Sequence, residues 1–118
     1  NFRLIRSLDP LLRRSDAGRA IFVTSGAAQK CRPYWGAYST TKAAMEAMVK
    51  TWAHETIKTD LRVNMLSPGP IATKMRAKAM PGEDQSLLAT PADLMPLFLK
   101  LASAAQTAHG ETFSFQPK

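Results

Sequence analysis

A short apolar run, residues 19–25, constrains the fold more than any other feature of the chain. Within it, Ala20-Ile21-Phe22-Val23-Thr24 joins β-branched and aromatic side chains without a charged residue, and Gly18 and Gly26 flank the run. Such a run is typical of a strand that is buried on both faces of a parallel sheet. A buried helical segment is the alternative, but the short length and the flanking glycines disfavour it. We therefore predict an α/β fold with residues 19–25 as a buried strand.

A long helix and a second strand are predicted next along the chain. Residues 37–58 are rich in Ala, Met, Glu and Lys, which favour helix, and are predicted to form the main helix. Residues 61–66 are predicted to form the second strand, which Ser67-Pro68-Gly69-Pro70 ends. Residues 71–79 then lead into a short helix, for which Thr73 is a suitable amino-terminal cap.

The two ends of the chain also carry recognisable patterns. Apolar side chains at helical spacing predict a helix over residues 1–15, which Pro10 is expected to kink or interrupt. Thr90-Pro91-Ala92-Asp93 is a strong helix start, and Pro96 is expected to bend that helix near its beginning. Residues 110–115 alternate like a final strand. The remaining predicted turns and loops are residues 15–18, 26–36 and 80–84.

Tyr38 and Lys42 lie four residues apart near the start of the main helix, so their side chains are expected on one helix face. An ammonium group beside a phenol stabilises the phenolate form, which allows a tyrosine to exchange a proton during turnover. Ser25 ends the first predicted strand, at the sheet edge where ligands of open α/β sheets bind. The three side chains are candidate catalytic groups, although a tyrosine and a lysine at this spacing also occur in helices by chance.

A wider pattern surrounds these three residues. Ser25, the pair Tyr38-x-x-x-Lys42 and the Pro-Gly loop within residues 62–75 resemble the short-chain dehydrogenase/reductase family in order and spacing. The resemblance covers residues 19–75 well and the flanks more loosely. It implies a Rossmann-like, doubly wound parallel sheet. This chain would hold an incomplete, carboxyl-terminal half of that sheet, with three strands and about four helices.

The resemblance implies a reaction in which hydride passes between NAD or NADP and a small-molecule carbonyl or alcohol. Tyr38 would be the acid–base group, Ser25 would orient the reacting oxygen, and Lys42 would assist Tyr38 and hold the nicotinamide ribose. The cofactor-binding residues would be Tyr38, Lys42, Pro68, Gly69, Ile71 and Thr73. Tyr34 and Trp35 would line the substrate pocket or, as an equal alternative, pack at the entrance of the main helix.

The glycine-rich turn with which this family approaches the cofactor's pyrophosphate has no counterpart in this sequence. The resemblance therefore implies that residues 1–118 are the carboxyl-terminal half of a single Rossmann-like domain. The family's catalytic asparagine would precede Asn1. We expect the chain on its own to be inactive, and its residues do not decide between NAD and NADP.

The net charge of +7 leaves open a basic nucleic-acid-binding module, but the basic residues are scattered along the chain. A soluble protein without nucleic acid is favoured. Lys74, Arg76 and Lys78 could form a cationic lid over the site or a solvated helix face, and the second is favoured. No zinc-finger spacing occurs, and no metal site is predicted.

Small side chains on a broad apolar surface of the main helix predict a partner subunit, and the resemblance implies a homo-dimer or homo-tetramer. No apolar run reaches the roughly 18 residues of a membrane span. The lone Cys31 suits a reducing cytoplasm. A non-catalytic relative that keeps the fold for assembly is a further alternative. His54 is expected on the outer side of the main helix, and no role is assigned to His109.

Overall fold

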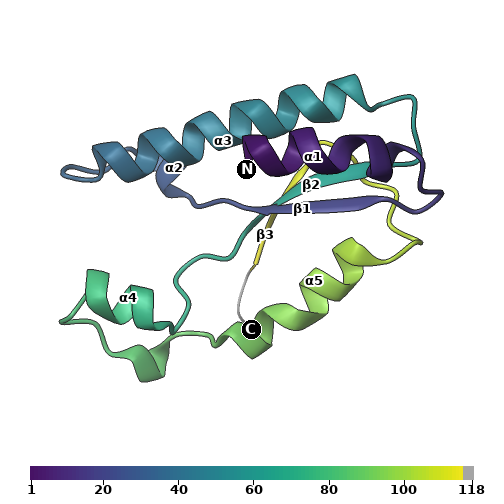
Figure 1. The fold of residues 1–118 in the computed structure, drawn as a ribbon. Coiled ribbons are helices and arrows are strands. Elements are labelled where there is room, and N and C mark those ends of the chain that lie inside the picture. Colours follow the sequence, from purple (N-terminus) through teal and green to yellow (C-terminus); the bar gives the residue numbers. More distant parts are fainter. Residues whose placement is uncertain (116–118) are drawn as a thin grey trace.

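The computed structural model describes residues 1–115 and contains a three-stranded parallel sheet with helices on both faces (Figure 1). The strands, in spatial order, are β1 (Arg19–Val23), β2 (Arg62–Ser67) and β3 (Thr112–Ser114). Leu66 of the central strand β2 lies opposite Val23 on one side and Phe113 on the other. Residues 63–66 are buried, because helices cover both faces of the sheet there. The predicted parallel α/β fold with three strands is confirmed.

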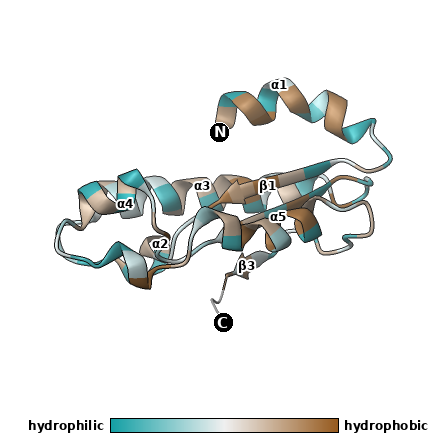
Figure 2. Ribbon diagram, turned by 90° about the horizontal axis from the view of Figure 1, so that it is seen from below, coloured by the Kyte–Doolittle hydropathy of each residue, from teal (hydrophilic) through white to brown (hydrophobic). Residues whose placement is uncertain are grey.

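One long helix covers one face of the sheet, a shorter helix covers the other, and a third helix lies apart from the strands, beside the free edge of β1 (Figure 2). α1 (Phe2–Arg13) and α3 (Gly36–Glu55) lie above the sheet in Figure 1, and α5 (Met95–Ala102) lies below it. The indole nitrogen of Trp52 on α3 donates a 2.7 Å hydrogen bond to Asp9 on α1, which ties the two helices together. The shorter elements are α2 (Ala27–Lys30), α4 (Lys74–Ala79) and the 3-10 turns Gln85–Leu87 and Pro91–Leu94.

Each face of the sheet has its own apolar core. The core beneath α3 consists of Met45, Val49, Trp52, Ala53, Leu61, Val63 and Met65. The core beneath α5 consists of Leu66, Ile71, Leu94 and Leu101. Alternate residues of β2 enter opposite cores, as the two-residue period of a strand requires. Figure 2 shows that hydrophobic residues recur along both α1 and α5. On α1, Ile5 and Leu12 pack against the first core, whereas Phe2 and Leu4 are exposed.

β1 differs from its prediction in length and in burial. It ends at Val23, two residues earlier than predicted, and it is only half-buried, with Val23 exposing 42 % of its surface. Among the described strands, β1 pairs only with β2, so it is an edge strand with one free side. The expectation of burial on both faces is therefore wrong for residues 1–115.

The helices differ from prediction in three places. The predicted loop 26–36 contains the one-turn helix α2, so the described residues hold five α-helices rather than about four. α1 runs through Pro10 without interruption. Arg6, whose carbonyl loses its usual amide donor at Pro10, is exposed, so water can take the place of that donor. Within the described part of the chain, no helix is both long and apolar enough to cross a membrane.

The segment before α5 starts at Thr90, as predicted. The Asp93 carboxylate accepts hydrogen bonds from the backbone N–H and the hydroxyl of Thr90, both at 2.7 Å. These bonds hold the pKa of Asp93 below its ordinary value. The first turn is a 3-10 turn rather than an α-turn, and α5 itself begins at Met95 with Pro96 in its first turn.

His109, to which the sequence assigns no role, joins two elements of the first core. Its Nδ1 accepts a hydrogen bond from the Val63 backbone at 3.2 Å, so the proton of the neutral ring lies on Nε2. Nε2 then donates to the carbonyl of Ala53 at 2.7 Å. The ring satisfies two backbone groups of fully buried residues, one in α3 and one in β2. His54, by contrast, is exposed, as predicted.

Candidate active site

A cavity of about 770 Å³ opens at the carboxyl ends of β1 and β2. This is the edge of a parallel sheet at which ligands of open α/β folds bind. Its walls come from the segment after β1, the first turns of α3, the loop after β2, and α4. The nine residues predicted for the site all line it: Ser25, Tyr34, Trp35, Tyr38, Lys42, Pro68, Gly69, Ile71 and Thr73.

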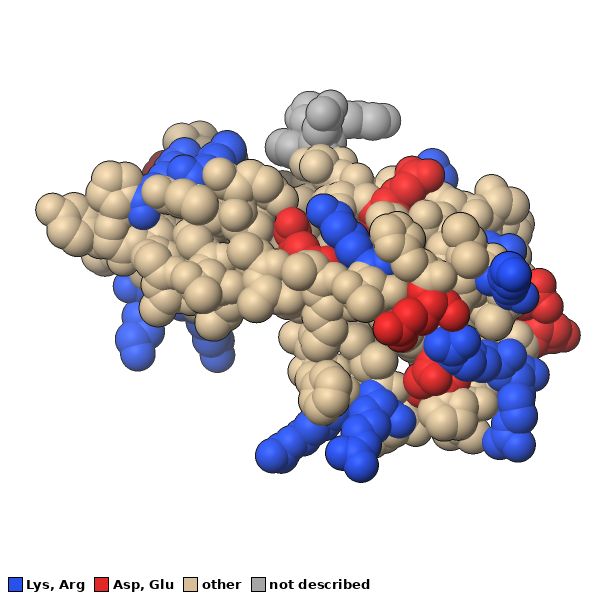
Figure 3. Space-filling model, turned by 90° about the horizontal axis from the view of Figure 1, so that it is seen from above, with Lys and Arg blue, Asp and Glu red and all other residues tan. Residues whose placement is uncertain are grey.

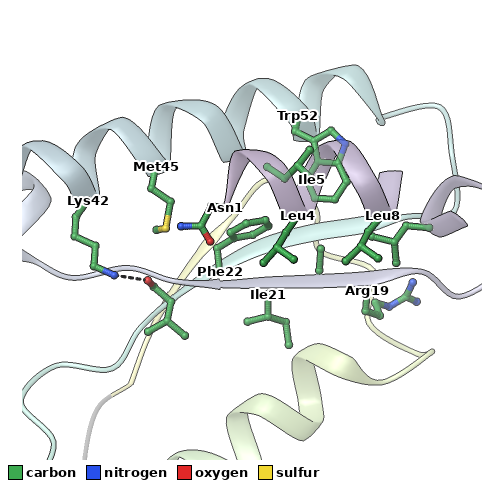
Figure 4. Close-up of a pocket in the computed structure, with 13 residues that line it drawn as sticks. Asn1, Leu4, Ile5, Leu8, Arg19, Ile21, Phe22, Lys42, Met45 and Trp52 are labelled. Carbon is green, nitrogen blue, oxygen red and sulfur yellow. Dashed lines mark hydrogen bonds between the residues drawn. The ribbon is translucent and has the colours of Figure 1, made fainter. Parts of the chain in front are cut away.

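Tyr38 and Lys42 lie on the same side of α3. The Lys42 ammonium nitrogen is 5.8 Å from the centroid of the Tyr38 ring. It also donates a 2.9 Å hydrogen bond to the carbonyl of Val23, drawn as a dashed line in Figure 4. This bond fixes the ammonium between α3 and the end of β1. Two of its three protons remain available to other groups.

Ser25 lies two residues beyond β1, in a turn that leads into α2. Its Oγ accepts a 3.2 Å hydrogen bond from the backbone N–H of Ala27. Its carbonyl accepts a 3.0 Å bond from the N–H of Ala28. Because Oγ serves as an acceptor in the turn, its own proton remains free to be donated into the cavity.

Tyr34 and Trp35 differ in exposure and in packing. Trp35 packs edge-on against Tyr38, with ring centroids 5.7 Å apart, and precedes α3 directly. It therefore lines the cavity and packs at the helix entrance at once. Tyr34 is fully exposed and has a left-handed backbone, with φ at 68°. A left-handed conformation is uncommon for a residue other than glycine, so the loop is strained at this position.

The loop after β2 forms another wall of the cavity. Gly69 has a φ of 70°, a conformation that favours glycine, and its missing side chain leaves the backbone accessible. Ile71 is nearly buried and is bridged to Ala89. The hydroxyl of Thr73 accepts a 3.1 Å hydrogen bond from the Arg76 backbone, which confirms Thr73 as the cap of α4.

Of the three cationic residues on α4, only Arg76 lines the cavity. Its guanidinium binds Glu83 in a bidentate pair at 2.6 and 2.7 Å. The hydrogen bonds from Arg76 hold the pKa of the Glu83 carboxyl below its ordinary value. Lys74 and Lys78 are exposed, as expected for a solvated helix face. On the face drawn in Figure 3, basic side chains lie in separate groups with acidic ones between them.

Sequence reasoning missed several residues near the site. Met75, Met80 and Leu94 line the cavity, but their segment carries no pattern beyond those of a helix, a turn and a helix start. Glu46 is buried on α3 beside the turn that holds Ser25, where it bonds Thr24. The sequence could have indicated Glu46, because it lies one helical turn after Lys42 and therefore on the helix face that carries Tyr38.

Comparison with known proteins adds an independent finding. A family model described as short chain dehydrogenase matches residues 1–84. A curated protein of Escherichia coli K12, described as the uncharacterized oxidoreductase YciK, is 44 % identical over 117 residues, which are 98 % of this chain and 46 % of YciK. An NADPH-dependent aldehyde reductase-like protein of Arabidopsis thaliana chloroplasts is 44 % identical over 64 residues, which are 54 % of this chain and 24 % of that protein.

Solved structures resemble this fold closely. A short chain dehydrogenase of Salmonella enterica serovar Typhi superposes with a TM-score of 0.92 at 45 % identity, over 98 % of this chain and 48 % of the other. An Escherichia coli CFT073 structure, described as a short chain dehydrogenase complexed with NADPH, has a TM-score of 0.91 at 44 % identity, with the same coverage. This chain thus spans about half the length of these relatives. With a family match over residues 1–84 and the same fold, the chain belongs to the short-chain dehydrogenase family.

Proposed function

We propose that this chain is the catalytic, carboxyl-terminal part of an oxidoreductase that interconverts a carbonyl and an alcohol with NADP(H) or NAD(H). One observation supports the proposal above all others. Ser25, Tyr38 and Lys42, from two separate segments, line the same cavity as the loop formed by residues 68–73. NADP(H) is favoured because related structures hold NADPH or NADP.

A second cavity supports the proposal that a preceding part of the protein completes the domain. About 470 Å³ of space lies between α1 and β1, walled by apolar side chains such as Leu4, Leu8 and Phe22 (Figure 4). β1 is an edge strand with one unpaired side, and such an edge is usually covered or paired in natural proteins. The family relatives are about twice as long as this chain. We call the full protein, with a preceding part covering β1, the complete reductase.

The residues of the first cavity fit a nicotinamide cofactor. Its volume of about 770 Å³ is within the usual range for small-molecule sites. Lys42 retains free ammonium protons for a ribose hydroxyl, and the Thr73 hydroxyl retains its own proton after capping α4. The open backbone at Gly69 allows close approach of a ring or an amide. A bound nicotinamide supplies the hydride, while the protein supplies position and electrostatics.

Tyr38, Lys42 and Ser25 have different roles toward the reacting oxygen of the substrate. Tyr38 exchanges the proton with that oxygen, and the nearby Lys42 ammonium stabilises the phenolate that results. Ser25 donates its free hydroxyl proton to the same oxygen and stabilises the charge that develops there. Trp35, packed against the Tyr38 ring, limits the positions that this ring can adopt.

We also infer a homo-oligomer and a cytoplasmic location. On α1, Phe2 and Leu11 are more than half exposed, and on α3 the small residues Ala43 and Ala47 face outward. A second subunit would remove this apolar surface from water. The single thiol of Cys31 is exposed and unpaired, as suits a reducing compartment.

The proposal is tested by following NADPH absorbance in mixtures of the complete reductase with a panel of aldehydes and ketones. We expect consumption of NADPH with at least one carbonyl and the reverse reaction with the matching alcohol and NADP. NADPH binding without turnover on any substrate would favour a non-catalytic relative. Salt-dependent retention of DNA or RNA, without cofactor binding, would favour a nucleic-acid-binding module.

A further inference from the structure

One buried carboxylate connects the segments that carry the site. Glu46 lies on α3 and exposes 7 % of its surface. Its Oε1 accepts a hydrogen bond from the Thr24 hydroxyl at 2.6 Å, and its Oε2 accepts one from the Gln29 side-chain amide at 2.8 Å. Thr24 directly follows β1, and Gln29 lies in α2. Glu46 therefore bonds the chain on both sides of the turn that holds Ser25.

The same turn is anchored to the sheet by its backbone. The N–H of Thr24 donates to the carbonyl of Leu66 on β2 at 2.8 Å. Within the turn, Ser25 accepts bonds from the N–H groups of Ala27 and Ala28. The backbone bond holds the turn against β2, whereas the Glu46 bonds hold it against α3. The Glu46 bonds, together with the bond from Lys42 to the carbonyl of Val23, link the segment around Ser25 to the helix that carries Tyr38 and Lys42.

Packing alone does not account for a carboxylate at this place. Burial of a charged group is unfavourable unless hydrogen bonds compensate for the lost water. Among the described residues, the salt bridges present do not include Glu46, so its compensation comes from Thr24 and Gln29. An apolar side chain would fill the space at a lower desolvation cost. What the carboxylate adds is two short, directional, charge-assisted bonds.

We propose that Glu46 is a positioning residue, which sets the place of Ser25 relative to Tyr38 and Lys42; this inference rests on the proposed function. Lys42 precedes Glu46 by one helical turn and Tyr38 precedes it by two, so the three residues share a face of α3. Ser25 and Tyr38 must reach the same oxygen atom. A misplacement of about 1 Å costs on the order of a hundredfold in rate, so loss of the link reduces turnover.

The first test is Glu46→Ala in the complete reductase, assayed at a temperature at which circular dichroism shows the variant to be folded. We expect kcat to fall by about 10- to 100-fold, whereas KM for NADPH changes by less than about threefold. Glu55→Ala is the matched control, because Glu55 is an exposed residue on the same helix. It should leave both constants unchanged. An unchanged kcat in Glu46→Ala would overturn the proposal.

A rescue experiment separates positioning from general stability. The double variant Glu46→Gln with Gln29→Glu exchanges acceptor and donor and keeps the bond to Thr24. We expect it to restore kcat to within about fivefold of the unmodified enzyme, since the geometry is regained. A merely structural role predicts that Glu46→Ala lowers the melting temperature while kcat of the folded variant stays unchanged. That result, or a double variant in which kcat does not recover, would contradict the proposal.

Hydrogen exchange provides a test that does not depend on activity. In Glu46→Ala, the amide protons of Ala27 and Ala28 should exchange about tenfold faster, because the Ser25 turn opens more often. The amide of Met65, which donates to Glu111 at 2.8 Å, should keep its rate. Unchanged exchange at Ala27 and Ala28 would show that Glu46 does not hold the turn. Absence of turnover in the unmodified protein would instead count against the proposed function.

Discussion

Replacing Tyr38 with phenylalanine is expected to lower kcat of the complete reductase by about a thousandfold, because general acid–base catalysis contributes on the order of 10² to 10⁴ in rate. The change removes one oxygen atom and its proton and keeps the ring. The edge-on contact with Trp35 and the place of the ring beside Lys42 should therefore survive. Dissociation constants for NADPH should change by no more than about threefold, since the other proposed cofactor contacts, at Lys42, Gly69 and Thr73, are left intact.

Tyr34→Phe is the matched control for this prediction. Tyr34 lines the same cavity but is fully exposed. The same loss of a hydroxyl there should leave kcat within about threefold, because the Tyr34 hydroxyl is not among the groups proposed to contact the reacting oxygen. Steady-state assays with NADPH, together with fluorescence titration of the cofactor, measure both quantities. Turnover at the unmodified level in Tyr38→Phe would refute the assignment of the acid–base role.

The 118-residue chain on its own is expected to bind NADPH at least about a hundredfold more weakly than the complete reductase and to show no turnover. Ligands of doubly wound sheets bind across the two halves of the fold, and we propose that this chain contributes one wall of such a site. The free side of β1 and the second cavity, between α1 and β1, remain uncovered in the isolated chain. We expect association or aggregation to compete with folding there.

Calorimetric titration of the isolated chain with NADPH measures this loss directly. A mixture with the separately produced preceding part of the complete reductase is the positive control and should recover binding, because β1 then gains its neighbour. Tight NADPH binding by the 118-residue chain alone would show that the cavity at the ends of β1 and β2 is sufficient. The proposal that this chain forms only part of the cofactor site would then be wrong.

The local elements were largely predictable from the sequence because their signals are local. The apolar residues of β2 alternate between the two cores, and Thr73 stands where a helix needs a cap. The shared cavity of Ser25 and Tyr38 could be predicted as well, because a serine after a strand and a tyrosine at the next helix start meet at one sheet edge. The catalytic roles of these residues remain predictions.

Other features of the fold and the site depend on tertiary contacts that cannot be predicted from a local sequence pattern. Val23 is exposed because β1 lies at the edge of the sheet. The same apolar sequence pattern is found in edge strands and in central strands, so the pattern does not predict this exposure. The bridging role of His109 requires that Ala53 and Val63, far away in sequence, come to its ring. Glu46 is similar, since its partner Thr24 lies in the turn after β1, 22 residues away in sequence. A buried polar group becomes recognisable only when its partners are known.

A crystal structure of the complete reductase with NADP and a bound alcohol or carbonyl would test the central claim most directly. The account predicts the nicotinamide beside residues 68–73, with Tyr38 Oη and Ser25 Oγ both about 2.6–3.2 Å from one ligand oxygen. Lys42 should lie within reach of the nicotinamide ribose. A nicotinamide bound outside this cavity, or a Ser25 hydroxyl directed away from the oxygen that Tyr38 contacts, would contradict it.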